Sequence, residues 1–329
     1  MRPLGRAGLT VGSHSFGVAA LGNLYRAVSA ADAAESVDAA WQAGVRYFDT
    51  APHYGLGLAE ERLGAALAER PRDEFIVSTK VGRLIVDTDA FPGETDDQGF
   101  DVPKDRIRVL DYSRDGVLRS IEDSLGRSGL DRIDIVLVHD PDDHYREAMD
   151  GAFPALEELR AAGVIRSYGA GMNQSEMLAD FIRNTDLDVV MAAGCYSLLD
   201  QPALDDLLPV ALERGVSVIA AGVFNSGILA SERATAASHY RYQPAAPEIV
   251  ERVNRIAEIC EAHGVTLPVA AAQFVRGHPA IATVCLGARS RAQVERNASL
   301  FEKAVPDALW AELVSEGYLD AAAPLPQFA

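Results

Sequence analysis

Short runs of β-branched and apolar residues alternate with longer segments of helical periodicity along almost the whole chain. The apolar runs predict strands near residues 13–16, 45–49, 75–80, 133–138, 166–170, 189–192, 216–220 and 282–286. Because each intervening helix returns the chain to the same edge, these strands are expected to be parallel. Eight such units predict an α/β fold, the (β/α)8 TIM barrel, and 329 residues with 48% apolar content suit one barrel domain over 1–329.

The helical segments begin and end with typical capping chemistry. Ser29 precedes one segment with Asp32 three residues later, an acidic variant of the capping box, and Gly44 follows its last turn. Further helices are expected near residues 58–68, 114–125, 151–161, 174–183, 204–214, 248–263, 291–300 and 307–316. An open doubly wound sheet competes with the barrel, but no GxGxxG motif follows the first strand, which weakens that alternative.

Two segments depart from simple alternation. The opening residues, with Gly5 and Gly8 between apolar positions, predict a β-hairpin that closes the barrel's floor. Residues 81–111 are too long for an ordinary connection, so we expect a long loop after strand 3 that projects over the rim toward a substrate.

Charge and composition exclude several functional classes. The formal net charge of −18 would repel nucleic acids and anionic membrane surfaces. No segment has the length and apolar character of a membrane span or secretory signal, so a cytoplasmic location is expected. The three cysteines, Cys195, Cys260 and Cys285, are widely separated in apolar surroundings and are expected to be buried free thiols.

Four residues with complementary acid–base chemistry follow strand-like runs. Asp49 and Tyr54 lie in DTAPHYG, Lys80 closes FIVSTK, and His139 lies in IVLVHDP. Catalytic residues of such barrels sit at the carboxyl ends of the strands, so the four side chains are expected to gather at one rim. Tyrosine titrates near pH ~10, and a cation beside it would favour the phenolate. Lys80 would supply that charge, Asp49 would hold the lysine, and His139 would orient a substrate oxygen.

Each of the four also has an ordinary structural interpretation. Asp49 could cap the next helix, Tyr54 could be an exposed loop aromatic, and Lys80 could be a rim charge. His139 could be satisfied within its own loop. Their joint placement after strands favours a catalytic group over four independent structural roles.

These motifs resemble those of the aldo-keto reductase superfamily. The similarity rests on DTAPHYG, STK and LVHDP, and it extends from RPLGRAGLTVG near the beginning to GARSRAQVERN near the end. The resemblance implies a (β/α)8 barrel whose catalytic tetrad is Asp49, Tyr54, Lys80 and His139. It also implies an extended NAD or NADP cofactor bound without a Rossmann domain, consistent with the missing glycine motif.

The resemblance assigns further residues to the cofactor. Asn173 matches the asparagine that hydrogen-bonds the nicotinamide carboxamide. The pyrophosphate is expected at the strand-seven loop, with Phe224, Asn225, Ser226 and Gly227. The adenosine end is expected at Gly287, Ala288, Arg289, Gln293 and Asn297. Two of these have structural alternatives, Asn225 as a turn former and Asn297 as an ordinary helix residue.

The cofactor preference stays open at this point. Arg289 and Arg291 could contact a 2′-phosphate, but arginine also binds pyrophosphate or occupies helix starts, so NAD and NADP both fit. Many family members place a glutamine and an aromatic ring beside the nicotinamide. Here small residues stand at those places, Ala193 or Gly194 and Ala221 or Gly222.

The glycine-rich segments and the tail GYLDAAAPLP are closer to one bacterial branch of the family. That branch contains D-threo-aldose (L-fucose) 1-dehydrogenase and pyridoxal 4-dehydrogenase. It implies oxidation of an aldose at C1 to a lactone, with pyridoxal 4-dehydrogenase or general aldehyde and ketone reductase activity as alternatives. Tyr25 and Asp140 are candidates for substrate contact, and the expected partner is a small sugar or aldehyde.

Two remoter alternatives have different chemistry. The segment HDPDDH, residues 139–144, resembles a cluster of metal ligands and would suit a metal-dependent barrel hydrolase. Its ligands all come from one loop rather than converging from several strands, so no metal site is expected. The same fold could also serve as a non-enzymatic cofactor-sensing subunit, because a fold alone does not establish turnover.

Overall fold

The computed structural model describes residues 1–241 and 243–326. Its centre is a closed barrel of eight parallel strands, in which the last strand pairs with the first. The predicted (β/α)8 architecture is therefore confirmed. In chain order the barrel strands are β3 (His14–Gly17), β4 (Tyr47–Asp49), β5 (Ile76–Val81), β8 (Ile135–His139), β9 (Ser167–Met172), β10 (Val189–Ala193), β11 (Ser217–Ala221) and β14 (Ile281–Gly287).

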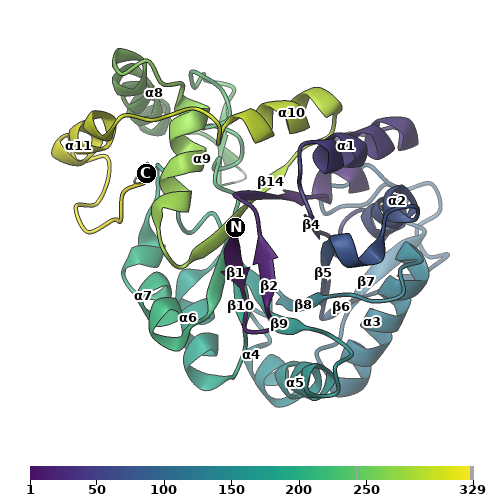
Figure 1. Cartoon of the computed structure of the whole chain (residues 1–329). Coiled ribbons are helices and arrows are strands. Elements are labelled where there is room, and N and C mark those ends of the chain that lie inside the picture. The colour runs from purple at the N-terminus through teal and green to yellow at the C-terminus, as the bar shows by residue number, and fades with distance from the viewer. Residues whose placement is uncertain (242, 327–329) are drawn as a thin grey trace.

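A two-stranded hairpin crosses the floor of the barrel. It consists of β1 (Arg2–Leu4) and β2 (Leu9–Val11), which lie over the barrel's centre in Figure 1. Leu4 and Leu9 belong to the same buried apolar cluster as Ile135 and Val189 of the barrel wall. The hairpin thus closes the barrel at this end, as predicted, and leaves the opposite rim for a site.

Helices form the outer layer between successive strands (Figure 1). Ser29 caps the first of them, since its hydroxyl accepts a hydrogen bond from the Asp32 backbone N–H at 3.0 Å, as the capping motif predicts. These helices are α1 (Ala30–Gln42), α2 (Leu58–Leu67), α3 (Arg114–Ser128), α5 (Phe153–Ala161), α6 (Ser175–Asn184), α7 (Leu207–Arg214), α9 (Leu267–Gly277) and α10 (Arg291–Ser299).

Several helical boundaries differ from the sequence prediction. The helix α9 was not predicted; nine of its eleven residues are buried, and a mostly apolar segment such as LPVAAAQFVRG does not by itself distinguish a helix from a buried strand. The segment expected to be helical from residue 151 begins earlier, with α4 (Tyr145–Glu147), and continues through a π-helical turn, η3 (Ala148–Ala152), into α5. The helix expected from residue 204 begins at Leu207, after a short 3-10 turn, η4 (Pro202–Leu204). Two more 3-10 turns are η1 (Ala19–Gly22) and η2 (Arg72–Glu74).

Two helices lie outside the repeating unit. They are α8 (Pro247–Ala262), which precedes α9, and α11 (Asp307–Ser315), which follows α10. They contact one another and stand together at one side of the barrel in Figure 1. Among the described residues, no helix has both the length and the hydropathy to cross a membrane.

The connection after β5 is more ordered than the predicted loop. It contains an antiparallel hairpin of β6 (Arg83–Asp87) and β7 (Arg106–Leu110). Between these strands the chain folds back, and Phe100 pairs with Leu24 in an isolated bridge. A second short hairpin, β12 (His239–Tyr240) and β13 (Gln243–Pro244), follows β11. The long connection therefore carries fixed side chains, and several of them lie near the rim described next.

Candidate active site

The structure brings Asp49, Tyr54, Lys80 and His139 together at the carboxyl-terminal rim. Asp49 is the last residue of β4, Lys80 lies in β5, and His139 is the last residue of β8. Tyr54 lies in the loop between β4 and α2. Three of the four residues therefore stand at the ends of buried strands, which are rigid elements suited to holding catalytic groups.

Lys80 is the centre of the group. Its ammonium donates to Asp49 Oδ2 at 2.9 Å, to Asp49 Oδ1 at 3.1 Å and to the backbone oxygen of Thr50 at 2.9 Å. It also lies 3.2 Å from the hydroxyl oxygen of Tyr54. The Lys80 and Asp49 side chains are only 2% and 3% exposed, so this is a buried ion pair whose polar atoms have partners.

Two residues that the sequence analysis did not single out support Asp49. The Ser78 hydroxyl donates to Asp49 Oδ1 at 2.7 Å, and the hydroxyls of Ser78 and Tyr47 are 2.9 Å apart. Ser78 precedes Lys80 by two residues, and Tyr47 precedes Asp49 by two. Because side chains alternate along a strand, residues two apart share a face, and this spacing could have identified both.

The loop that carries Tyr54 is fixed by a close backbone contact. A Cβ atom on Gly55 would lie 2.3 Å from the backbone oxygen of Gly22, and one on Gly22 would lie 2.7 Å from the Tyr54 backbone. Gly55 also has a φ of +63°, in the left-handed region that glycine adopts without strain. Glycine at both positions therefore allows the approach that sets the height of Tyr54 above the barrel.

The protonation of Tyr54 differs from the sequence expectation. Burial raises the pKa of Tyr54 to about 12, and the favourable charge of Lys80 offsets only part of that effect. Burial also disfavours the charged form of Lys80, but Asp49 and Tyr54 outweigh it and raise the pKa of Lys80. The prediction of a phenol made acidic by the lysine is thus wrong for the protein alone, because the sequence does not reveal the desolvation of Tyr54.

His139 faces the same group as a neutral ring. Its centroid lies 6.0 Å from that of Tyr54, at an interplanar angle of 89°. Burial, followed by the charges of Lys80 and Arg83, lowers the pKa of His139 well below its ordinary value. Tyr112 donates its hydroxyl to the backbone oxygen of His139 at 2.9 Å and so fixes the end of β8.

The two residues predicted to contact substrate lie in different surroundings. Asp140 follows His139 with a φ of 41°; one of its carboxylate oxygens lies 3.0 Å from Arg83 and 3.6 Å from His139 Nε2. Tyr25 is 65% exposed, and the charge of Arg289 acts on its hydroxyl. Asp140 therefore lies beside the four central residues, whereas Tyr25 lies toward the predicted adenosine end.

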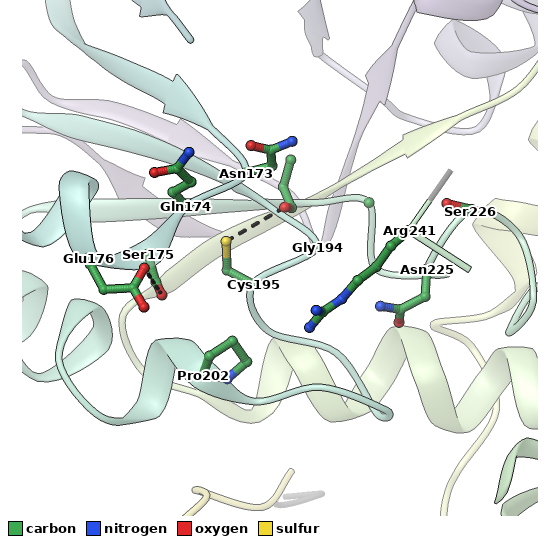
Figure 2. A pocket seen from close by; sticks show the side chains of 12 residues that line it. Asn173, Gln174, Ser175, Glu176, Gly194, Cys195, Pro202, Asn225, Ser226 and Arg241 are labelled. Carbon is green, nitrogen blue, oxygen red and sulfur yellow. Dashed lines mark hydrogen bonds between the residues drawn. The ribbon is translucent and has the colours of Figure 1, made fainter. Parts of the chain in front are cut away.

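A cavity of about 430 Å³ opens at the ends of β9, β10 and β11. Figure 2 shows Asn173 and Gln174 on one side and Asn225 and Ser226 on the other. Asn225 donates to Asp200 at 2.9 Å, but its own Oδ1 atom is buried and has no hydrogen-bond partner among the described residues. Arg241, Glu176 and Cys195 also line the cavity and were not predicted from the sequence. Phe224 is partly buried against the main apolar core.

The small residues Gly194 and Gly222 line the same cavity. Gly222 has a φ of +61°, and a Cβ atom there would lie 3.0 Å from the Gly194 backbone nitrogen. Close packing thus accounts for glycine at position 222, whereas Gly194 has open space around its Cβ position and is favoured by its φ of +72°.

The residues predicted for the adenosine end surround the turn between β14 and α10. Gln293 accepts a hydrogen bond from the Arg289 backbone N–H at 2.9 Å, and Asn297 donates to the Gly287 oxygen at 3.1 Å. Both side chains therefore order this turn, whatever else they contact. Ala288 is buried and Gly287 is exposed.

In the loop that resembles a cluster of metal ligands, three side chains are engaged in protein contacts. Asp140 pairs with Arg83, Gln174 donates to Asp142, and His144 lies 3.3 Å from Glu147. Among the described residues, no group of three His, Cys, Asp or Glu side chains is placed to hold a metal ion. The cysteines are free and buried, as predicted.

A closed parallel barrel with a buried lysine–carboxylate pair, a tyrosine and a histidine at its rim defines an oxidoreductase of the aldo-keto type. The family model described as the aldo/keto reductase family matches residues 15–315. The chain belongs to this family.

Relatives of known activity align over nearly the whole chain. D-threo-aldose 1-dehydrogenase from a Pseudomonas species is 45% identical over 93% of this chain and 94% of its own length. Pyridoxal 4-dehydrogenase from Microbacterium luteolum is 42% identical over 97% of both chains. Among solved structures, the holo form of an aldo-keto reductase from Bacillus halodurans is 26% identical, with a TM-score of 0.75, over 98% of this chain and 97% of that one.

Members of this family use a nicotinamide dinucleotide, and the cavity fits such a group. It is lined by amides, hydroxyls and an arginine, and the unpartnered Oδ1 of Asn225 requires a donor from whatever fills it. Asn173, Asn225, Ser226 and Arg241 are the residues that would hold the cofactor here.

Proposed function

We propose that this protein oxidises an aldose at its anomeric carbon to a lactone, with NAD or NADP as hydride acceptor. The observation that carries the proposal is the 3.2 Å approach of Lys80 Nζ to the Tyr54 hydroxyl beside Asp49 and His139. The choice of an aldose follows the 45% identity with D-threo-aldose 1-dehydrogenase.

Tyr54 would move the proton. In oxidation its oxygen accepts the proton of the C1 hydroxyl, and Lys80 stabilises the phenolate form that this step requires. In carbonyl reduction the same hydroxyl donates the proton, as microscopic reversibility demands. The nicotinamide, when bound, accepts or donates the hydride.

The raised pKa of Tyr54 means that its hydroxyl is protonated before the reaction begins. At neutral pH the phenol keeps its proton, so it is ready to donate to a carbonyl, whereas oxidation must begin by drawing on the small phenolate fraction. A cationic nicotinamide nearby would increase that fraction, since an adjacent positive charge favours the anion.

His139 would orient the reacting oxygen. Its neutral ring can donate one hydrogen bond without the desolvation cost of an imidazolium, and its edge faces Tyr54. Asp140, within 3.6 Å of Nε2, would then bind a neighbouring substrate hydroxyl together with Arg83.

Arg289 would contact the phosphate at the adenosine end. It is half-buried and has no carboxylate partner among the described residues. Its pKa is lowered, first by burial and second by the nearby charge of Arg26. Arg291 is occupied instead, by Glu35 at 2.9 Å and Gln42 at 3.1 Å. Two neighbouring cations favour a multiply charged phosphate.

A second candidate substrate is pyridoxal, supported by the 42% identity with pyridoxal 4-dehydrogenase. The direct test is to incubate the purified protein with NAD or NADP and a panel of aldoses, including L-fucose, beside pyridoxal. We expect reduced cofactor to accumulate with at least one aldose and a lactone to be detected. Turnover of pyridoxal alone would assign the second function, and no turnover of either class would contradict both.

A further inference from the structure

His53 lies directly before Tyr54 and is in contact with the centre of the site. Its ring centroid is 5.5 Å from that of His139, 6.0 Å from that of Tyr54 and 5.2 Å from that of Phe100. The ring thus stands between the proposed proton-transfer pair and the long connection after β5.

Arg108 of β7 fixes the orientation and the tautomer of this ring. Its Nε atom donates to His53 Nδ1 at 2.6 Å, and its NH2 group donates to the His53 backbone oxygen at 2.9 Å. An arginine is always protonated and can only donate, so Nδ1 must be the acceptor. Burial, with the charges of Arg108, Arg83 and Lys80, lowers the pKa of His53 to about 3, and the neutral ring therefore carries its proton on Nε2.

Arg108 is itself held rigidly. It pairs with Asp96 through two contacts, at 2.5 and 3.2 Å, and the two side chains are 5% and 1% exposed. Asp96 lies between β6 and β7, so the long connection fixes the guanidinium from both sides. A bidentate buried pair of this kind is strongly directional, which suits a positioning role.

The protonated nitrogen of His53 has no protein acceptor. Within residues 1–241 and 243–326 no group accepts a hydrogen bond from Nε2, and this atom is not among the fully buried polar atoms that lack a partner. By contrast, Nδ1 of His139 is buried and without a partner. The open donor of His53 therefore lies beside the reacting groups and requires an acceptor from outside the protein.

We propose that His53 Nε2–H donates a hydrogen bond to a substrate oxygen next to the reacting carbon, and that Arg108 positions this donor. The inference rests on the proposed function. It makes His53 a specificity-determining residue for substrates with an oxygen at the adjacent carbon, as in aldoses and α-hydroxyaldehydes. A substrate without this oxygen leaves the donor unpaired, and such mismatches lower kcat/KM by about ten- to a hundredfold.

Matched aldehydes test the proposal in the direction of reduction. Glyceraldehyde and propanal have the same carbon chain, but only glyceraldehyde has an oxygen on the carbon beside the carbonyl. His53→Phe keeps an aromatic ring and removes the donor, so we expect kcat/KM for glyceraldehyde to fall about tenfold or more, mainly through KM, and that for propanal to stay within about twofold. His53→Gln, whose amide reaches near the Nε2 position, should recover part of the loss. Equal losses on both aldehydes, or no loss on either, would overturn the assignment.

A spectroscopic measurement tests the role of Arg108 without relying on turnover. In the wild-type protein the nitrogen NMR shifts of the His53 ring should be those of a neutral ring protonated on Nε2 alone. Arg108→Lys keeps the positive charge beside Asp96 but loses the guanidinium geometry. We expect a mixture of tautomers of the His53 ring and a partial fall in kcat/KM for glyceraldehyde. A wild-type ring protonated on Nδ1 would overturn the inference. If wild-type protein oxidises no aldose and reduces neither aldehyde, the proposed function fails and this inference with it, whereas wild-type activity unchanged in His53→Phe contradicts the inference alone.

Discussion

Lys80 and Asp49 form an ion pair with a separation of 2.9 Å beneath the Tyr54 hydroxyl, and both charged side chains are almost inaccessible to water. Burial of the pair is tolerated because Ser78 and the Thr50 backbone satisfy further hydrogen-bonding positions. The pair fixes a positive charge at one point under the phenol. Such a charge needs no reorganisation when the proton moves.

Breaking this pair should lower the stability of the fold. Asp49→Asn leaves the Lys80 charge buried without its counter-ion, and we expect the free energy of unfolding to fall by about 3–5 kcal/mol. Ser78→Ala removes only one hydrogen bond to Asp49 and should cost about 1–2 kcal/mol. Denaturant unfolding of the two variants measures the difference. Equal stabilities would mean that the buried charge is compensated by another group.

The pH dependence of the two reaction directions should differ. With the pKa of Tyr54 raised to about 12, the phenolate fraction grows as pH rises, so kcat for oxidation should climb from about pH 7 to about pH 10. Reduction uses the protonated phenol and should stay level over that range. Lys80→Met removes the charge that favours the phenolate, so the rise in kcat for oxidation should move to higher pH. A move to lower pH in that variant would show that Lys80 does not stabilise the anion.

The backbone contact behind Tyr54 can be tested with a pair of glycine substitutions. Gly55→Ala combines a left-handed φ with a clash against Gly22, so we expect a loss of about 2–4 kcal/mol in stability and a marked fall in kcat. Gly129→Ala also has a positive φ, of +66°, but open space around its Cβ position, and should cost only about 1 kcal/mol with kcat unchanged. Thermal unfolding and initial rates distinguish the two. A fall in kcat of the same size in both variants would remove the special role of the Gly22–Gly55 contact.

The arginines at the adenosine end should differ in their effect on cofactor binding. Arg289→Ala removes a cation without a carboxylate partner among the described residues, and we expect KM for NADP to rise about tenfold, with a smaller change for NAD. Arg291→Ala breaks contacts with Glu35 and Gln42 and should leave both KM values within about twofold. Initial-rate measurements with each cofactor decide this. A larger effect from Arg291 would reverse the assignment.

The sequence predicts the barrel and the gathering of the four rim residues because both follow from local pattern. Strand ends in a parallel barrel meet at one rim, so a residue that follows a strand, such as Lys80 or His139, is placed without knowledge of packing. Ser78 and Tyr47 could be predicted in the same way, because residues two apart on a strand share a face. The buried helix α9 escapes such reasoning, since a mostly apolar segment does not distinguish a helix from a strand.

The remaining features depend on packing between distant segments. Arg108 and His53 are 55 residues apart, and nothing local indicates that their side chains meet. The direction of the pKa shift of Tyr54 is also hidden, because burial and the charge of Lys80 oppose one another and only the folded structure shows that burial is larger.

The proton-transfer role of Tyr54 is tested most directly by Tyr54→Phe, which removes the hydroxyl and keeps the ring. Binding of NAD or NADP, followed by fluorescence titration, should stay within about twofold of wild type. The single-turnover rate of hydride transfer with saturating cofactor and aldose should fall by about 10²–10⁴-fold. A variant that binds cofactor and transfers hydride within about tenfold of the wild-type rate would contradict the assignment of Tyr54 as the acid–base group.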